Sequence, residues 1–520
     1  MRPLAFVLLL LLLCTGTPDE LSAQEQRGRQ IYLTGTSPSG ADLTAVLGDQ
    51  GAEVPATVLP CVTCHGRDGR GKPEGGIVPS NLTWEALTKP YGATSPGGRQ
   101  RPPYTEQRLK RAITMGLDAG DTPLDIAMPR YRLSGQDLDD LVAYLKRLGH
   151  ETDPGLTERS LRVGVILAPP ALLAEKNSAV RAVLTAYFDD VNRRGGLYNR
   201  RIDLLFLDAP EALEKRSAAA RAFIEEEQLF AIVAPFIAGI DEAMAALAAD
   251  LAIPFIGAFS VDPQVGFPLN RQVFYLYAGL NDQARALVTY AAHHQDGRNP
   301  NAAILYTTQP IPEAVAAAVE DQAIREGWTT ITKRGLASAS FDAPALARDL
   351  QSSGVELVFW LGPPQQDKAF LDAAEALSWT PTVFIPGTLA GPELFAAPKG
   401  FAGRLFLSLP TSPGDLTPDG KRTYEQLAAS YPLPAYQQAT QWAALASATL
   451  FTEGLVRAGR DVSRNKLIAK LEEFYQFQTG FTPPLTYGPN QRIGALGAYI
   501  VSVDLDRQRL VPVGEWTVPR

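Results

Sequence analysis

Cysteine is scarce in this sequence: only three occur among 520 residues, which excludes a disulfide scaffold. There is also no excess of basic residues, because 48 Lys and Arg stand against 56 Asp and Glu and give a net charge of −8. A mildly acidic chain is a poor general phosphate binder, which argues against nucleic acid as a partner. The remaining composition, 45% hydrophobic and 20% charged, is typical of globular proteins, and the length predicts several compact units.

Long hydrophobic runs are also scarce, and the clearest one lies at the N-terminus. Arg2 precedes an apolar stretch over residues 4–14, and small and polar residues follow as far as Ala23. This order predicts a secretory signal peptide, residues 1–23, cleaved near Ala23. The run of about ten residues is shorter than the ~20 needed to span a bilayer, which disfavours the alternative of an uncleaved membrane anchor. We therefore expect an exported chain in the periplasm.

The two cysteines beyond this segment lie in one short motif. Residues 61–65 read Cys-Val-Thr-Cys-His, the spacing at which c-type haem is attached. A redox disulfide would instead favour a strand before the motif and a helix after it, and a zinc site would need a second pair of cysteines. The sequence therefore predicts one covalent haem c, with thioethers from Cys61 and Cys64 and an iron ligand from His65.

The second axial ligand of the iron must come from elsewhere in the chain. Met128 lies in a loop just before a predicted helix, where a loop can bring its sulfur over the distal face. Met115 is the alternative, although its spacing favours the end of a helix and a place in the core. His150 lies at the far end of the last helix. We predict Met128, and thioether ligation favours electron transfer over oxygen chemistry.

Helical patterns flank the haem motif. Ser134 and Asp137 are typical of an N-terminal capping box, and apolar residues at helical spacing follow them. Near the start, Gly28 and Tyr32 lie one helical turn apart. With the haem motif, these features make residues 24–150 resemble class I cytochrome c, a small all-α domain.

The resemblance implies two sets of contacts. In that family the glycine and the aromatic residue of the first helix cross a leucine and an aromatic residue of the last helix, which here are Leu141 and Tyr144. A family proline, matched here by Pro79, accepts a hydrogen bond through its carbonyl from the haem-ligating imidazole. That bond would fix the tautomer of His65.

The rest of the chain follows a different pattern. Residues 151–160 are polar and predict a linker. Short apolar runs then alternate with helical stretches, which predicts α/β architecture with doubly wound parallel sheets covered on both faces. About 360 residues are too many for one such core, so two lobes are expected. The expected strands are 161–167, 202–207, 230–233, 254–258, 302–306, 357–361, 382–385 and 404–409.

This second region, residues 161–520, resembles the type I periplasmic binding proteins, in the branched-chain amino-acid and amide-binding branch. The resemblance rests on residues 188–198 (FDDVNRRGGLY), 253–257 (IPFIG), 280–284 (LNDQA) and 492–495 (RIGA). It implies two lobes joined by about three chain crossings, with a small-molecule ligand bound between them.

The predicted ligand pocket departs from that of amino-acid binders. The first loop of lobe one offers Phe236 and no hydroxyl, and the second keeps Ser260. On lobe two, the loop with Thr388 carries no acid to hold an ammonium group, and Trp360 adds a large flat surface. A pocket of this kind suits a less polar ligand that is not a standard amino acid. Phe236 and Trp360 have the alternative of a place in the core, and Ser260 that of a helix cap.

Three functions compete on these observations. The first is a periplasmic electron carrier fused to a leucine-binding-protein-like domain, with a redox protein as partner and no enzymatic activity. The second is the substrate-binding component of an ABC importer for amino acids or other solutes, with a permease as partner and the cytochrome as accessory. The third is a haem-dependent oxidoreductase, which a methionine-ligated iron disfavours. Under the first we add the hypothesis that ligand binding shifts the haem potential.

Overall fold

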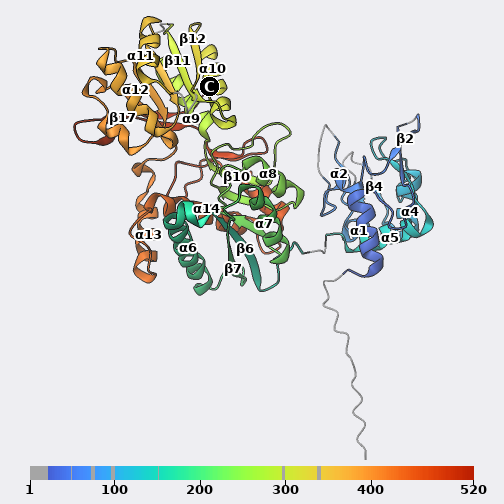
Figure 1. Cartoon of the computed structure of the whole chain (residues 1–520). Coiled ribbons are helices and arrows are strands. Elements are labelled where there is room, and N and C mark those ends of the chain that lie inside the picture. The colour runs from blue at the N-terminus through green and yellow to red at the C-terminus, as the bar shows by residue number, and fades with distance from the viewer. Residues whose placement is uncertain are drawn as a thin grey trace, which may run out of the picture. The chain divides into compact units, whose positions relative to one another are not determined.

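The computed structural model describes residues 21–48, 50–71, 77–94, 100–149, 152–294, 299–336 and 341–519. Of the predicted signal peptide only the last three positions belong to the described residues, and His150 lies outside them. The chain divides into two compact units, with the boundary between Thr152 and Asp153. Figure 1 labels many of the elements of both units.

Helices dominate the first unit, and short strands accompany them. The helices are α1 (Ala23–Thr34), α2 (Cys61–His65), α3 (Trp84–Leu87), α4 (Glu106–Met115) and α5 (Gly135–Arg147). The strands β2 (Ala52–Pro55), β1 (Thr44–Leu47) and β5 (Arg130–Arg132) form an antiparallel sheet in that order, and β3 (Ala93–Thr94) pairs with β4 (Gln100–Arg101). The sequence predicted an all-α unit, and the structure adds these short strands to it. Strand β5 begins two residues after Met128.

The core of the first unit is built where α1 crosses α5. A Cβ atom on Gly28 would lie 1.9 Å from the carbonyl oxygen of Asp140, so only glycine permits this approach. One turn later, Tyr32 packs against Tyr144 with ring centroids 5.5 Å apart, and both rings are buried together with Leu141. The predicted crossing of these two helices is confirmed.

Lobe one of the second unit contains a six-stranded parallel sheet in the order β16-β10-β9-β8-β6-β7. Its strands are β6 (Ser160–Leu167), β7 (Arg201–Asp208), β8 (Ala231–Val233), β9 (Phe255–Ala258), β10 (Val273–Tyr277) and β16 (Ile493–Ala495). The accompanying helices are α6 (Pro170–Arg193), α7 (Leu213–Glu226), α8 (Asp241–Asp250), α13 (Pro418–Ser430), α14 (Gln438–Ala458) and α15 (Arg464–Leu471). In Figure 1 this lobe lies below lobe two, and each lobe has its own sheet with helices packed on it.

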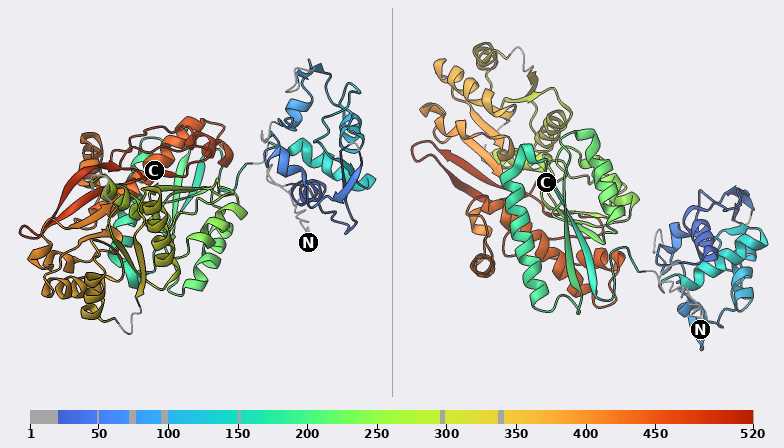
Figure 2. Two further views of the ribbon diagram at one scale, coloured as in Figure 1. Left: turned by 90° about the horizontal axis from the view of Figure 1, so that it is seen from above. Right: turned by 60° about the horizontal axis from the view of Figure 1, so that its bottom comes forward.

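Lobe two contains a seven-stranded sheet in the order β12-β11-β13-β14-β15-β17-β18. The first five strands are parallel: β12 (Ile331–Leu336), β11 (Ala302–Thr307), β13 (Leu357–Leu361), β14 (Thr382–Pro386) and β15 (Leu405–Leu409). The hairpin of β17 (Ala498–Asp504) and β18 (Arg509–Thr517) adds an antiparallel edge, which Figure 2 shows extending from the lobe. Its α-helices are α9 (Leu280–His293), α10 (Pro310–Arg325), α11 (Ala343–Ser352) and α12 (Pro364–Ala376), and the short 3₁₀ turns η2 (Gly387–Leu389), η3 (Pro392–Ala396), η4 (Lys399–Phe401) and η5 (Pro413–Asp415) follow β14 and β15.

The order of strands makes the described chain pass between the lobes three times. The passages follow β10, follow β15 and join β16 to β17. All eight predicted strand runs coincide with strands, whereas β10, β12, β16, β17 and β18 were not predicted. None of the described helices is long and apolar enough to cross a membrane.

Most of the segment predicted as a linker belongs structurally to lobe one. The backbone N–H of Arg464, at the start of α15, donates to Asp153 Oδ2 at 2.5 Å. Leu156 is buried in the core of lobe one, and the side chain of Arg200 donates to the carbonyl of Thr157 at 2.7 Å. A buried leucine and these two anchors hold the chain from Asp153 onward, so the free connection between the units is shorter than ten residues.

Candidate functional site

The haem motif occupies a helix of its own. Helix α2 contains residues 61–65, begins after Pro60 and ends at Gly66, which has a positive φ of 75°. Cys61 and Cys64 are three residues apart and so project from the same side of the helix. Cys61 is half-buried against the core of the unit, and desolvation of its thiol raises the pKa to about 12, whereas Cys64 is exposed. One thiol therefore faces the interior of the unit and the other faces its surface.

His65 ends the helix as a buried, neutral imidazole. Only 6% of its surface is exposed, and burial lowers its pKa below the ordinary value. Its Nδ1 lies 2.9 Å from the carbonyl oxygen of Ser80. A carbonyl can only accept, so Nδ1 carries the proton and Nε2 keeps the lone pair that iron would bind.

The acceptor of that bond is Ser80 and not Pro79, which corrects the contact implied by the family resemblance. The carbonyl of Pro79 instead faces Gly71, where a Cβ atom would lie 2.3 Å from its oxygen. Neighbouring carbonyls of a non-helical chain point in different directions, so only one of the two can face His65. The function of the bond is kept, because the tautomer of the imidazole is fixed by either carbonyl.

Two tyrosines that sequence reasoning did not connect with the motif hold both ends of helix α2. The hydroxyl of Tyr32 donates to the carbonyl of Gly66 at 2.6 Å, and that of Tyr131 donates to the carbonyl of Leu59 at 2.6 Å. Burial raises the pKa of both hydroxyls, so they stay protonated as donors. Tyr131 stands three residues after Met128, which was the available signal that it belongs to the site.

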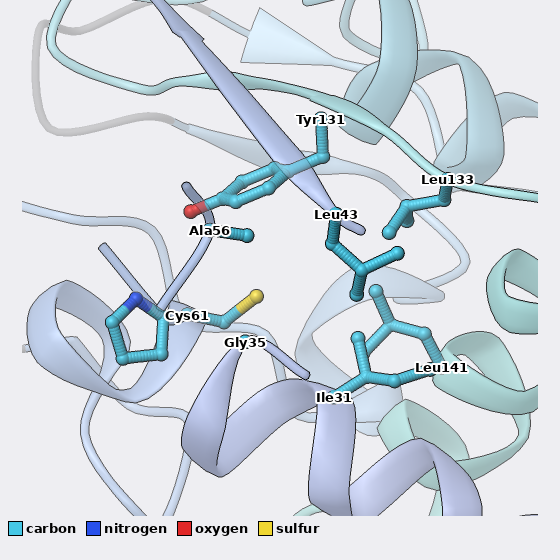
Figure 3. Close-up of a pocket in the computed structure, with 9 residues that line it drawn as sticks. Ile31, Gly35, Leu43, Ala56, Cys61, Tyr131, Leu133 and Leu141 are labelled. Carbon is cyan, nitrogen blue, oxygen red and sulfur yellow. The ribbon is translucent and has the colours of Figure 1, made fainter. Parts of the chain in front are cut away.

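An apolar pocket opens beside the helix. Figure 3 shows the sulfur of Cys61 directed into this pocket, among the side chains of Leu43, Ile31 and Leu141. Tyr131 closes another side with its ring. The apolar walls around the Cys61 thiol suit a porphyrin, which is a flat and largely apolar group, and His65 of the same helix supplies a nitrogen of the kind that its iron binds.

Met128 lies in the loop that precedes β5. It is half-buried and packs against the core of the first unit. This position suits an iron ligand, because a haem would lie against the same core. Its own N–H donates to the carbonyl of Asp125 at 3.0 Å, which closes a tight turn. Met115 does end α4 as predicted, but 65% of its surface is exposed, so it does not pack in the core. An exposed helix end offers no apolar crevice for iron ligation.

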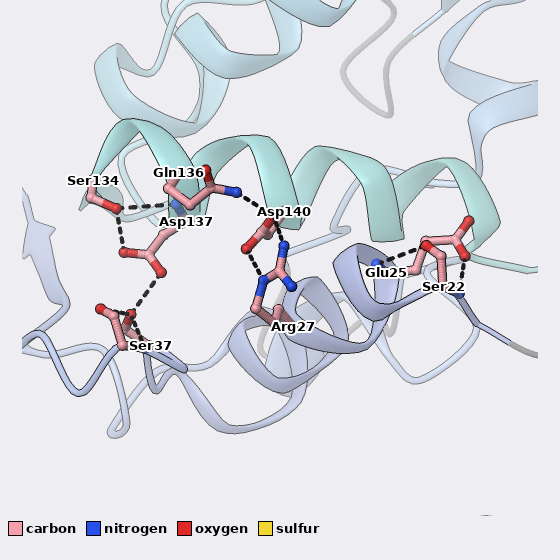
Figure 4. Close-up of polar contacts among 9 residues, drawn as sticks. Ser22, Glu25, Arg27, Ser37, Ser134, Gln136, Asp137 and Asp140 are labelled. Atoms are coloured by element: carbon pink, nitrogen blue, oxygen red, sulfur yellow. Dashed lines mark hydrogen bonds and ion pairs between the residues drawn. The ribbon is translucent and has the colours of Figure 1, made fainter.

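Polar contacts fasten α5 across the site, as Figure 4 shows. Ser134 caps the helix by accepting from the N–H of Asp137 at 3.1 Å. The carboxylate of Asp137 accepts from the hydroxyls of Ser134 and Ser37, both at 2.6 Å, instead of completing the predicted capping box. One turn on, Arg27 of α1 donates to both oxygens of Asp140 at 2.7 and 3.1 Å. These bonds fix the helix pair behind the pocket.

In lobe one the predicted pocket residues Phe236 and Ser260 are brought together. The loops after β8 and β9 are joined by a bridge between Phe236 and Phe259, the neighbour of Ser260. Ser260 does not cap a helix; its hydroxyl donates to Asp241, which also accepts from the N–H of Gly239 at 2.8 Å. Burial raises the pKa of Asp241, and these hydrogen bonds oppose the rise. This buried acid was missed, although it stands only five residues after Phe236.

In lobe two the predicted residues separate. Trp360 is fully buried and stacks on Phe370 with centroids 5.3 Å apart, so it takes the alternative of a core residue. Strand β13 is covered on both faces, because Phe359 enters one core and Trp360 the other. Thr388 is exposed in the 3₁₀ turn after β14. Of the two residues, only Thr388 lies where a ligand could touch it.

Comparison with known families agrees with both architectures. A family model described as periplasmic binding protein matches residues 160–508, which is more than half of the chain. The chain belongs to the periplasmic binding protein family. A second model, described as cytochrome c, matches residues 50–149 and so includes helix α2 and Met128. A cytochrome c domain implies haem c with iron. No curated protein matches the sequence.

Solved structures share the fold of the second unit. A branched-chain amino acid ABC transporter protein from Thermus thermophilus with bound valine is 17% identical, with a TM-score of 0.55, over 70% of this chain and 97% of that one. A fatty acid ABC transporter substrate-binding protein from Thermomonospora curvata is 15% identical, with a TM-score of 0.53, over 70% and 94%. A substrate-binding protein from Desulfitobacterium hafniense in complex with Leu is 18% identical, with a TM-score of 0.52, over 68% and 100%. Identities this low show the fold alone.

Proposed function

We propose that this protein is a periplasmic electron carrier with one covalent haem c and a fused small-molecule-binding unit. The observation that carries the proposal is helix α2, which presents Cys61, Cys64 and a His65 whose tautomer is fixed by Ser80. Both thiols and the free Nε2 are then available to one porphyrin. The proposal includes export by the signal peptide predicted over residues 1–23.

The residues of the first unit support electron transfer rather than catalysis. When bound, the haem supplies a one-electron couple. His65 and Met128 would both hold the iron through a nitrogen and a sulfur, which favours electron transfer over the binding of a peroxide or a substrate. Tyr32 and Tyr131 hold the helix that carries the ligands, and the apolar walls exclude water. We therefore propose that the protein is not an enzyme.

The second unit is proposed to bind a neutral, partly apolar molecule. Ser260 is engaged by the buried Asp241, so its hydroxyl is not free to hold a ligand carboxylate. A second carboxylate beside Asp241 would also be repelled. The loop around Thr388 carries no acid, and Phe236 adds an apolar surface. These residues do not favour an amino-acid zwitterion.

A second function, the substrate-binding component of an ABC importer, is favoured by one observation. The family match covers both lobes, and the structural relatives are described as ABC transporter proteins. On this alternative a permease is the partner and the cytochrome is accessory. It predicts that ligand affinity is the same for oxidised and reduced haem.

One set of measurements on the full chain tests these functions. Potentiometric titration should give a single one-electron couple, and cyanide or carbon monoxide should bind slowly to a six-coordinate iron. Rapid binding of either molecule would indicate an open position and an oxidoreductase. A thermal-shift panel of valine, leucine, a fatty acid and neutral aromatic compounds should favour the neutral compounds. Stronger stabilisation by valine or leucine would overturn the proposed ligand class.

A further inference from the structure

The loop that carries Met128 is fastened at several points along its length. It leaves α4 at Gly116, whose carbonyl accepts from the N–H of Leu124 at 2.7 Å. Within the loop, the carboxylate of Asp125 accepts from the N–H of Ala127 at 2.9 Å, and its carbonyl accepts from the N–H of Met128. These bonds fix the backbone as far as the N–H of Met128. The backbone carbonyl of Met128 is held by a side chain outside this set, that of Arg130.

Arg130 makes that connection. Its guanidinium donates through Nη1 to the carbonyl of Met128 and through Nη2 to the carbonyl of Leu124 at 3.2 Å. The planar fork holds both carbonyls in one fixed geometry, whereas the donors of an ammonium group rotate and fix no such geometry. Arg130 itself is held by β5, where it pairs with Val46 of β1. The fork therefore links the Met128 loop to the sheet.

Gly116 provides the space for this guanidinium. A Cβ atom at position 116 would lie 1.6 Å from Nε of Arg130 and 2.0 Å from its Cζ. The glycine also has a φ of 68°, which a side chain disfavours. Gly116 at the start of the loop therefore contacts the side chain of Arg130 near the end of the loop.

We infer that Arg130 is the positioning residue for Met128, holding the loop so that the thioether is presented to the haem iron. This inference rests on the proposed function, in which Met128 is the second axial ligand. Arg130 acts through the backbone carbonyls of Met128 and Leu124 and supplies no iron ligand itself. Residues that orient a metal ligand in this way typically change its affinity by about 10- to 100-fold when they are lost.

The chain offers a matched control for the test. Arg132 lies on the same strand, but it is exposed and pairs with Glu53 at 2.7 Å. The variants Arg130→Met and Arg132→Met remove the same charge, and only the first removes the fork. In the full-length haem protein, we would measure the weak red absorption band of a methionine-ligated ferric haem and the rate of cyanide binding.

Arg130→Met should weaken or abolish the band and raise the cyanide-binding rate by about tenfold or more, whereas Arg132→Met should leave both unchanged. Arg130→Lys keeps the charge without the fork and should behave like Arg130→Met. A wild-type band in Arg130→Met or Arg130→Lys, or an equal loss in Arg132→Met, would overturn the inference. If Arg130→Met does not mature, Gly116→Ala displaces the same guanidinium and should weaken the band.

Failure of the proposed function would give a different result. Met128→Ala should remove the band completely, because it removes the sulfur itself. A band that persists in Met128→Ala would show that another residue ligates the iron, and the role of Arg130 would be overturned together with that assignment. Loss of the band in Met128→Ala with a wild-type band in Arg130→Met would overturn the positioning role alone.

Discussion

The two units hold their functional residues in different ways. In the first, the two thiols and the imidazole lie on one five-residue helix, and the tertiary structure only has to orient that helix through Tyr32 and Tyr131. In the second, the residues proposed to face a ligand stand on loops far apart in sequence, such as Phe236 and Thr388. A contiguous site can tolerate changes elsewhere in its unit, whereas a dispersed site depends on the whole sheet that positions its loops.

The largest expected effect is the loss of covalent haem. Replacing both Cys61 and Cys64 by serine removes both thioethers, so all haem should be extracted by acidified acetone, while wild-type haem stays with the protein. Cys64→Ser alone should retain haem through one bond. The melting transition of the binding unit, followed by calorimetry, should not move in either variant. Extraction of haem from the wild type would contradict the covalent attachment.

The second prediction separates a core residue from a loop residue in the binding unit. Trp360→Ala should lower the free energy of unfolding of this unit by about 3–5 kcal/mol, because it leaves a cavity beside Phe370. Thr388→Ala, at an exposed position, should change it by less than about 0.5 kcal/mol. Denaturant titration of both variants measures this difference. Unchanged stability with weakened ligand binding in Trp360→Ala would return the tryptophan to the pocket.

The contrast between the units also explains what could be predicted from the sequence. The grouping of Cys61, Cys64 and His65 was accessible because their spacing in the sequence is local, and the helix crossing at Gly28 was accessible because close backbone contact demands glycine. The place of Trp360 in the core could not be predicted. The side chains of β13 alternate between two buried cores, and the sequence does not show whether one of these faces borders a ligand instead.

Other features depend on the path of the backbone, which no local pattern reports. The acceptor of the His65 bond is Ser80 because of the direction of one carbonyl in a loop. Asp241 stands beside Ser260 only because β8 and β9 are neighbours in the sheet. Both contacts join residues at least 15 positions apart, so periodicity and capping signals could not reveal them.

Buried aspartates extend the comparison to pH. In the binding unit, burial raises the pKa of Asp367 to about 6, and its Oδ2 has no hydrogen-bond partner among the described residues. The unfolded value is about 3.9, so its ionisation costs stability progressively as the pH rises through this interval. Asp367→Asn should therefore stabilise the unit by about 1–3 kcal/mol at pH 7 and have little effect at pH 3. Equal effects at both values would exclude ionisation as the cause.

Asp140 in the haem unit should behave in the opposite way. Its hydrogen bond with Arg27 lowers its pKa, so the folded state is stabilised by ionisation. That stability is present above the unfolded pKa of about 3.9 and is lost as the pH falls through the lower folded value. Asp140→Asn should destabilise the unit at pH 7 and flatten its acid unfolding curve. The effect should be smaller than for Asp367, because the side chain of Arg27 is 41% exposed and water screens the pair.

The smallest expected effect is the energy that the two units share. Leu148 is buried in the haem unit and Asp153 is bonded to lobe one, so the connecting chain extends at most about 18 Å. Because Asp153 is attached to lobe one, a movement of lobe two would reach the connecting chain only through lobe one.

We therefore expect a ligand to shift the haem potential by about 10–59 mV, which corresponds to less than a tenfold change in ligand affinity for a one-electron couple. The measurement is a redox titration with and without a saturating compound from the panel. Asp153→Ala, which frees the tether from α15, should reduce the shift without changing the potential of the ligand-free protein. A shift below about 10 mV would mean that the units share a chain without sharing energy, and one above 59 mV would require a fixed interface that the tether does not provide.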